Sequence, residues 1–233
     1  MKFTFVTLFS SLCQGYFSDS ILKRAIDKKY IEIDYLSPRD FTTNKHKKVD
    51  DYQIGGGAGL TLMTQPLDSL ICDIKEKNSD AHVIFVLPSA KPFRQIDAMR
   101  LASKKHIVLV SGRYEGFDER SIEMLADEVF SVGDFILTGG ELPSLCICDS
   151  ISRQVDGVLG NSDSLSGESF ENNLLEAPGF TKPNIFKNTE VTKEYLSGNH
   201  KKINQIKKEL AKYKTKFFRP DLFEKVKVLV DKN

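Results

Sequence analysis

Two glycine-rich loops follow two short apolar segments between residues 106 and 143. The first apolar segment, 106–110, leads into the loop 112–116, and the second, 128–132, leads into the loop 133–140. Glycine allows positive φ and lets the backbone approach a ligand closely. In an open α/β sheet, ligands bind at the carboxyl ends of the strands. We therefore expect a ligand site built from both loops.

The spacing of the glycines excludes the common phosphate-binding motifs. The chain has no G-x-x-x-x-G-K-[ST] motif, and the run 55–59 does not match G-x-G-x-x-G because Leu60 occupies the last glycine position. A nucleotide-phosphate site is therefore disfavoured.

Strand and helix patterns alternate along the first 160 residues. Strands are predicted over 3–9, 30–35, 82–87, 106–110 and 128–132, and helices over 94–104 and 141–153, after Ser18-Asp19, around Leu67–Ile74 and from Phe117 onwards. This alternation is typical of an α/β fold in which a parallel sheet carries helices on both faces. The stretch 36–64 has no convincing periodicity, and its length favours a functional loop.

The C-terminal part differs in composition from the rest. Residues 182–233 contain 14 Lys and Arg against 6 Asp and Glu, although the whole chain of 233 residues carries a net charge of only +1. Such a basic region suggests a polyanionic partner. Helices are predicted over 200–214 and 221–230. We predict a catalytic domain over 1–160, a linker over 161–172 and a small, mainly helical domain over 173–233.

Several classes of protein are disfavoured by the composition. No apolar run approaches the ~20 residues of a membrane span, and the N-terminus is a poor signal peptide, so a cytoplasmic protein is expected. The four cysteines form no C-x-x-C pair and the four histidines are scattered. We expect reduced thiols in the core and no metal site.

The motifs GRYEGFDER (112–120) and SVGDFILTGGELP (131–143) resemble those of the bacterial tRNA (guanine-N1)-methyltransferases, which belong to the SPOUT class. The resemblance extends over most of the chain. It includes SPRDFT at 37–42, VDD at 49–51, GGG at 55–57, GVLG at 157–160, LSGNH at 196–200 and RPDL at 219–222. It implies a deep trefoil knot formed by the two glycine loops. It also implies a homodimer in which both subunits build each active site.

The same resemblance implies that S-adenosyl-L-methionine is the methyl donor. The residues that match the donor pocket of the family are Leu87, Pro88, Gly112, Tyr114, Glu115, Val132, Gly133, Asp134, Phe135, Ile136, Leu137, Gly139, Gly140 and Pro143. Adenine needs an apolar slot with backbone hydrogen bonds, which residues 132–137 can provide. The chain departs from the family at Ala90, where glycine is usual, and at Pro92, where lysine is usual.

The implied reaction is methylation of N1 of the guanosine immediately 3′ of the anticodon, at position 37. A general base must remove the N1 proton, and a donor near O6 must stabilise the developing negative charge. Arg153 matches the arginine of the family and suits the second task. The base matches Glu168, where the family usually has aspartate. Asp163 is the alternative, but its spacing from Gly160 fits less well.

The residues expected to bind the tRNA are Asp50, Ser169, Lys182, Ser197, Asn199 and His200. Lysine contacts of this kind mostly reach phosphates and supply affinity rather than sequence specificity. Ile206 and Lys207 stand where the family often has Trp and Arg. Two alternatives remain at this point: a SPOUT methyltransferase with another RNA target, and a non-catalytic RNA-binding protein. A protein without turnover would not need the intact glycine loops.

Overall fold

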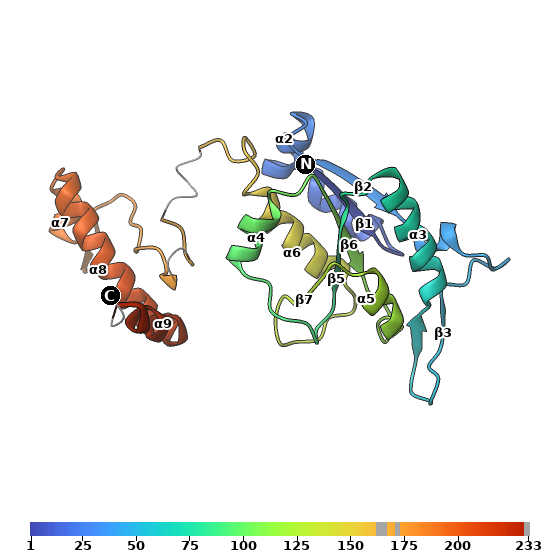
Figure 1. The fold of residues 1–233 in the computed structure, drawn as a ribbon. Helices are drawn as coiled ribbons and strands as arrows, with labels where there is room; N and C mark the ends of the chain where they lie inside the picture. Colours follow the sequence, from blue (N-terminus) through green and yellow to red (C-terminus); the bar gives the residue numbers. More distant parts are fainter. Residues whose placement is uncertain (162–166, 171–172, 231–233) are drawn as a thin grey trace. The chain divides into compact units, whose positions relative to one another are not determined.

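A computed structural model of the chain describes residues 1–161, 167–170 and 173–230 (Figure 1). The chain divides into two compact units, Met1–Asn161 and Ser162–Asn233. Each unit is described by itself below.

The N-terminal unit contains a parallel sheet of five strands in the order β2-β1-β6-β5-β7. The strands are β1 (Lys2–Val6), β2 (Glu32–Leu36), β5 (His82–Val86), β6 (His106–Ser111) and β7 (Glu128–Phe130). The register places Val6 beside Val110 and Val86 beside Ser111, so the central strands end at a common edge. The predicted strands and the α/β class are confirmed, although β1 and β7 end earlier than expected, at Val6 and Phe130.

Helices cover both faces of this sheet (Figure 1). Because side chains alternate along a strand, Phe3, Ile107 and Leu109 face one side, whereas Val6, Val108 and Val110 face the other. The first face packs against α2 (Ser20–Asp27), α4 (Gln95–Leu101) and α6 (Glu141–Ser152), and the second against α3 (Thr64–Lys77) and α5 (Glu119–Leu125). Two buried apolar cores therefore support the sheet beneath the loops at its carboxyl edge.

The stretch 36–64, predicted to lack regular structure, contains short elements. A 3₁₀ turn, η2 (Pro38–Phe41), precedes a hairpin of β3 (Asp50–Tyr52) and β4 (Leu60–Leu62). Each strand has only three residues, which is too short for alternation to be recognised. Another short helix, α1 (Ser11–Gln14), and the 3₁₀ turn η1 (Gly15–Phe17) were also not predicted.

The expectation that all four cysteines are core residues is wrong for two of them. Cys13 and Cys148 are buried, but Cys72 and Cys146 are exposed. Cys146 and Cys148 do point to different faces of α6, as their spacing on a helix requires.

The C-terminal unit is mainly helical. It contains a small hairpin of β8 (Ile185–Phe186) and β9 (Thr189–Glu190), followed by α7 (Lys193–Leu196), α8 (His200–Phe218) and α9 (Pro220–Val230). Ala211, Thr215 and Leu222 are buried. The Thr215 hydroxyl also accepts a hydrogen bond from the amide of Leu175 at 2.9 Å, which ties the preceding segment to α8. In the described part of the chain, none of the helices combines the length and apolar character that a membrane crossing requires.

Candidate active site

A cavity of about 350 Å³ opens at the carboxyl ends of β5, β6 and β7. The segments 86–89, 112–117 and 131–140 supply most of its wall, and α5 and α6 supply the rest. Its lining residues are Val86, Leu87, Pro88, Ser89, Gly112, Arg113, Tyr114, Glu115, Gly116, Phe117, Glu119, Ile122, Ser131, Val132, Gly133, Phe135, Ile136, Leu137, Thr138, Gly139, Gly140 and Pro143.

The structure brings together the residues that the resemblance placed at a methyl-donor pocket. All of them line the cavity except Asp134, which is exposed on the same loop and is not part of the lining. The sequence reasoning did not single out Arg113, Phe117, Glu119, Ile122 and Thr138. Phe117 and Ile122 could have been found in part, because they lie near the start of the helix that was predicted directly after the first glycine loop.

The two glycine loops meet at Gly112 and Gly140. The amide of Gly140 donates a hydrogen bond to the carbonyl oxygen of Gly112 at 2.8 Å. A Cβ atom on Gly140 would lie 2.6 Å from the Gly112 nitrogen and 2.8 Å from the Cα of Ser111. Just below, the buried hydroxyls of Ser111 and Ser144 are 2.9 Å apart. Gly140 is therefore required for the close packing of backbone against backbone.

The β3–β4 hairpin holds the first loop from its other side. Leu60 and Leu62 accept hydrogen bonds from the amides of Glu115 and Asp118, each at 2.9 Å, and the amide of Leu62 donates to Gly116 at 2.9 Å. Within this loop Tyr114 has φ +58°, a left-handed conformation that costs a non-glycine residue about 1–2 kcal/mol. The hydrogen bonds from the hairpin to the neighbouring residues stabilise that conformation.

The Glu115 side chain occupies the space left free by Gly59. Gly59 has φ +90°, and a Cβ there would lie 2.7 Å from Oε1 and 2.8 Å from Cγ of Glu115. Glu115 and Glu119 both line the cavity, so its wall carries two carboxylates. Such a wall favours a ligand with positive charge.

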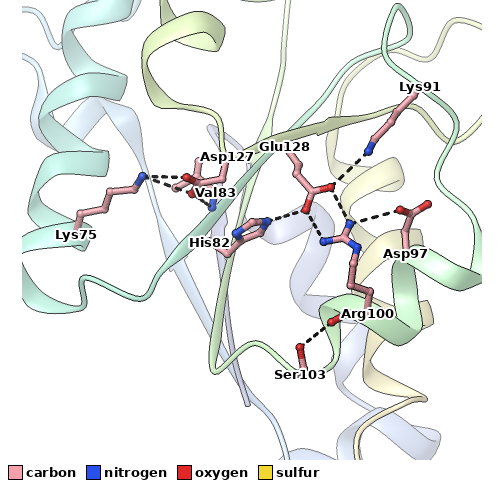
Figure 2. Close-up of polar contacts among 9 residues, drawn as sticks. All are labelled: Lys75, His82, Val83, Lys91, Asp97, Arg100, Ser103, Asp127 and Glu128. Carbon is pink, nitrogen blue, oxygen red and sulfur yellow. Dashed lines mark hydrogen bonds and ion pairs between the residues drawn. The ribbon is translucent and has the colours of Figure 1, made fainter.

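An ion-pair network surrounds Glu128, the first residue of β7, which leads into the second loop. Figure 2 shows Glu128 between His82, Arg100 and Lys91. Arg100 donates to both Glu128 oxygens at 2.9 and 2.7 Å, and Nε2 of His82 lies 2.8 Å from Oε1. Burial alone would raise the pKa of Glu128, but the hydrogen bonds from Arg100 and His82 outweigh it and lower the pKa to about 2.

The same network reaches the segment that follows β5. Lys91 Nζ lies 3.5 Å from Glu128 Oε2, and the carbonyl of Lys91 accepts from the amide of Ser131 at 2.9 Å. The segment after β5 and the segment after β7 are therefore joined by main chain and side chain together.

The predicted catalytic residues lie in different units. Arg153 follows the last residue of α6 and is half-buried, and Glu168 is half-buried in the C-terminal unit. Asp163, the alternative base, lies outside the described residues.

The predicted tRNA-binding residues are placed by local structure. Asp50 begins β3, and Lys182 is exposed. Ser169 accepts a hydrogen bond from the amide of Glu176, Ser197 donates to the carbonyl of Glu194, and the Asn199 side chain caps α8 by accepting from the amide of Lys202. His200 is exposed in the first turn of α8. Within the described ranges, no group of three or more His, Cys, Asp or Glu residues could hold a metal ion.

Residues 1–225 match the family model described as tRNA (Guanine-1)-methyltransferase TrmD. The chain belongs to this family. The matched range includes both glycine loops, Arg153, Glu168 and all of α8, so the tRNA (guanine-1)-methyltransferase match extends over both units.

Individual relatives are similar over nearly their whole length. A tRNA (guanine-N(1)-)-methyltransferase of Sulfurimonas denitrificans is 62% identical over 221 residues, covering 95% of this chain and 96% of the relative. Proteins of the same name from Campylobacter curvus and a Sulfurovum species are 59% and 61% identical, over 227 and 225 residues. These matches cover 97% of this chain in both cases, and 96% and 99% of the relatives.

Proposed function

We propose that this enzyme transfers the methyl group of S-adenosyl-L-methionine to N1 of a guanosine in tRNA, the one immediately 3′ of the anticodon at position 37. The observation that carries the proposal is the cavity at the sheet edge, whose wall consists of the two loops that bear the family motifs. Mass spectrometry of tRNA incubated with protein and methyl donor tests it. Methylation of a different nucleotide, or of none, would overturn the proposal.

The cavity has suitable walls for the donor. Val132, Phe135, Ile136 and Leu137 offer apolar surface and backbone hydrogen-bonding groups for the adenine. Glu115 and Glu119 offer negative charge to the sulfonium and the ammonium of the methionine part. When bound, the donor supplies an electrophilic methyl group. The side chains of the enzyme orient the reactants and exclude water.

Glu168 and Arg153 are assigned to the nucleobase. The N1–H bond breaks as its proton passes to the Glu168 carboxylate, and a new N1–CH₃ bond forms while the sulfur leaves as the neutral thioether. The Arg153 guanidinium stabilises the negative charge that develops on O6 as the proton leaves. Both residues lie within the matched range.

The C-terminal unit is assigned to tRNA binding. Lys201, Lys202, Lys207, Lys208 and Lys212 are exposed along α8, where they can neutralise phosphates. Arginine would offer bidentate contacts at such positions, whereas lysine supplies a mobile point charge. The residue range 173–233 thus becomes the RNA-binding domain and 1–160 the donor-binding domain.

A homodimer with a trefoil knot in each subunit completes the proposal. An exposed apolar face formed by Phe9, Leu12, Tyr16, Leu142 and Cys146 supports the dimer, because monomers rarely expose contiguous apolar patches. The tight contact between Gly112 and Gly140 supports a crossing of the two loops. Sedimentation equilibrium tests the dimer: Leu142→Asp should give monomers, and an unchanged mass would remove this face as the interface.

A further inference from the structure

We propose that the ion pair between Arg113 and Glu141 is a positioning clamp that keeps the two glycine loops in the shape that binds the methyl donor. Neither residue takes part in the proposed chemistry. The inference rests on the assignment of the cavity to the donor.

The clamp joins three segments. Arg113 Nη2 lies 2.9 Å from Glu141 Oε2, and Arg113 Nε donates to Oε1 at 3.1 Å. Arg113 Nη1 donates to the carbonyl oxygen of Thr138 at 3.1 Å. One guanidinium therefore fixes the first glycine loop to the end of the second loop and to the first residue of α6.

Neighbouring side chains contact both members of the ion pair. The Thr7 hydroxyl, at the end of β1, donates to Glu141 Oε1 at 2.7 Å, and the ring of Phe9 lies 4.7 Å from Arg113 Cζ. The side chains of Arg113 and Glu141 are only 17% and 4% exposed. Buried charges of this kind persist only when they are paired.

Gly139 leaves the space that the pair occupies. A Cβ on Gly139 would lie 2.6 Å from both Nε and Cζ of Arg113 and 2.7 Å from Glu141 Oε2. The absence of a side chain at this position therefore has a specific reason. It allows the loop to lie directly on the ion pair.

The clamp also controls charge at the cavity wall. Arg113 lines the cavity beside Thr138 and Gly139, and an unpaired guanidinium there would repel a cationic donor. Glu141 neutralises that charge from behind the loop. Loss of either partner thus changes both the shape and the potential of the wall.

The test measures two properties of the full-length wild type and its variants. One is the melting temperature, and the other is the affinity for S-adenosyl-L-methionine, measured by calorimetry. Arg113→Gln and Glu141→Gln each leave one buried charge unpaired, which should lower the melting temperature by roughly 10 °C. The double variant has no buried charge and should regain most of that loss. If the pair is a positioning clamp, all three variants should bind the donor at least tenfold more weakly, with kcat at saturating donor changed less than about threefold.

Arg113→Lys adds a variant that preserves the charge. Lysine can pair with Glu141 but lacks the rigid fork that also reaches Thr138, so its melting temperature should stay near that of the wild type while donor affinity falls. The matched control is Arg120→Gln, which breaks the exposed pair with Asp118 outside the cavity lining. Its donor affinity should not change.

Four outcomes would overturn the clamp. One is a double variant that regains donor affinity together with its melting temperature. Another is an Arg113→Lys variant that binds the donor like the wild type. If the wild-type chain itself does not bind the donor, the proposed function fails and the clamp fails with it. Normal binding by both wild type and variants rejects the clamp alone.

Discussion

The amide of Gly140 and the carbonyl oxygen of Gly112 form a 2.8 Å hydrogen bond that joins the two loops of the donor cavity. The loops can approach this closely because Gly140 has no side chain. Its position at the carboxyl edge of the sheet makes the cavity sensitive to small changes in either loop.

Gly140→Ala should weaken donor binding at least tenfold and lower the free energy of unfolding by about 2–3 kcal/mol. The reason is that the new Cβ would lie 2.6 Å from a backbone nitrogen, which cannot move as a side chain can. Calorimetry with the donor and thermal unfolding measure the two effects. Gly160→Ala, where a Cβ meets no atom within 4 Å, is the control. Equal donor affinity in both variants would contradict the assignment of the cavity.

Gly59→Ala should displace the Glu115 carboxylate and reduce donor affinity by roughly tenfold. Because Gly59 has φ +90°, alanine also strains the backbone, at a cost of about 1–2 kcal/mol. Gly56→Ala separates the two effects, since Gly56 has φ +87° but open space around its Cβ position. Both variants should lose similar stability, and only Gly59→Ala should bind the donor weakly. Equal donor affinity in Gly59→Ala and Gly56→Ala would show that donor binding does not require the Glu115 carboxylate at this position.

Glu128→Gln should reduce the dependence of stability on pH. The Glu128 pKa of about 2 is below the usual glutamate value of 4.5, so the stabilisation is complete above pH 5 and is lost as the pH falls towards 2. The Glu128 carboxylate contributes at most about 3 kcal/mol to the free energy of unfolding. Urea unfolding of wild type and variant from pH 6 to pH 3 measures the difference, which should narrow with acid. A constant difference would show that the carboxylate titrates normally.

Glu168→Gln should slow methylation by something like 10²–10⁴-fold if its carboxylate accepts the N1 proton. Glutamine keeps the size and the hydrogen bonding but cannot take that proton, so the affinities for donor and tRNA should barely change. Glu168→Asp, which restores the residue usual in the family, should retain much of the rate. Single-turnover methylation decides between the carboxylates: a slow Asp163→Asn beside a normal Glu168→Gln would move the base to Asp163.

A chain that ends at Asn161 should bind the donor normally and lose most of its affinity for tRNA. The reason is that the lysines of α8 are removed, while the unit Met1–Asn161 keeps its own cores. In the full chain, Lys208→Gln should flatten the slope of log affinity against log salt by about one. Lys23→Gln, whose lysine pairs with Asp27 on α2, is the control. Undiminished tRNA binding by the shorter chain would contradict the role of the C-terminal unit.

The sheet could be predicted from the sequence because its strands are buried and its helices are amphipathic. Segments such as 83–87 and 107–110 are apolar throughout, as expected when both faces of a parallel sheet are covered. The β3–β4 hairpin could not be predicted, since its strands are short and its tip is mostly glycine. Asp134 was assigned to the cavity together with the residues on both sides of it, but the turn of the loop places it outside the lining.

The clamp shows a second limit of sequence reasoning. Arg113 and Glu141 are 28 residues apart, and no periodicity relates a loop residue to the first residue of a distant helix. Only the folded loops bring them together. Glu141 is a charged residue at the start of an apolar helix, and this pattern could have marked it as a candidate for a buried ion pair. Without the neighbouring Thr7, however, it could equally be read as a favourable charge at a helix N-terminus.

A second hollow, lined by Leu12, Leu142 and Leu145, shares Arg113, Leu137, Thr138 and Gly139 with the donor cavity. In the proposed arrangement, the wall shared by the two cavities would have the donor on one side and the apolar face of the dimer on the other. Occupation of one side would then support the other, and we expect donor binding and subunit association to be linked equilibria. The apparent affinity for the donor will weaken as the protein is diluted. The donor in turn will hold subunits together at concentrations at which the empty protein dissociates.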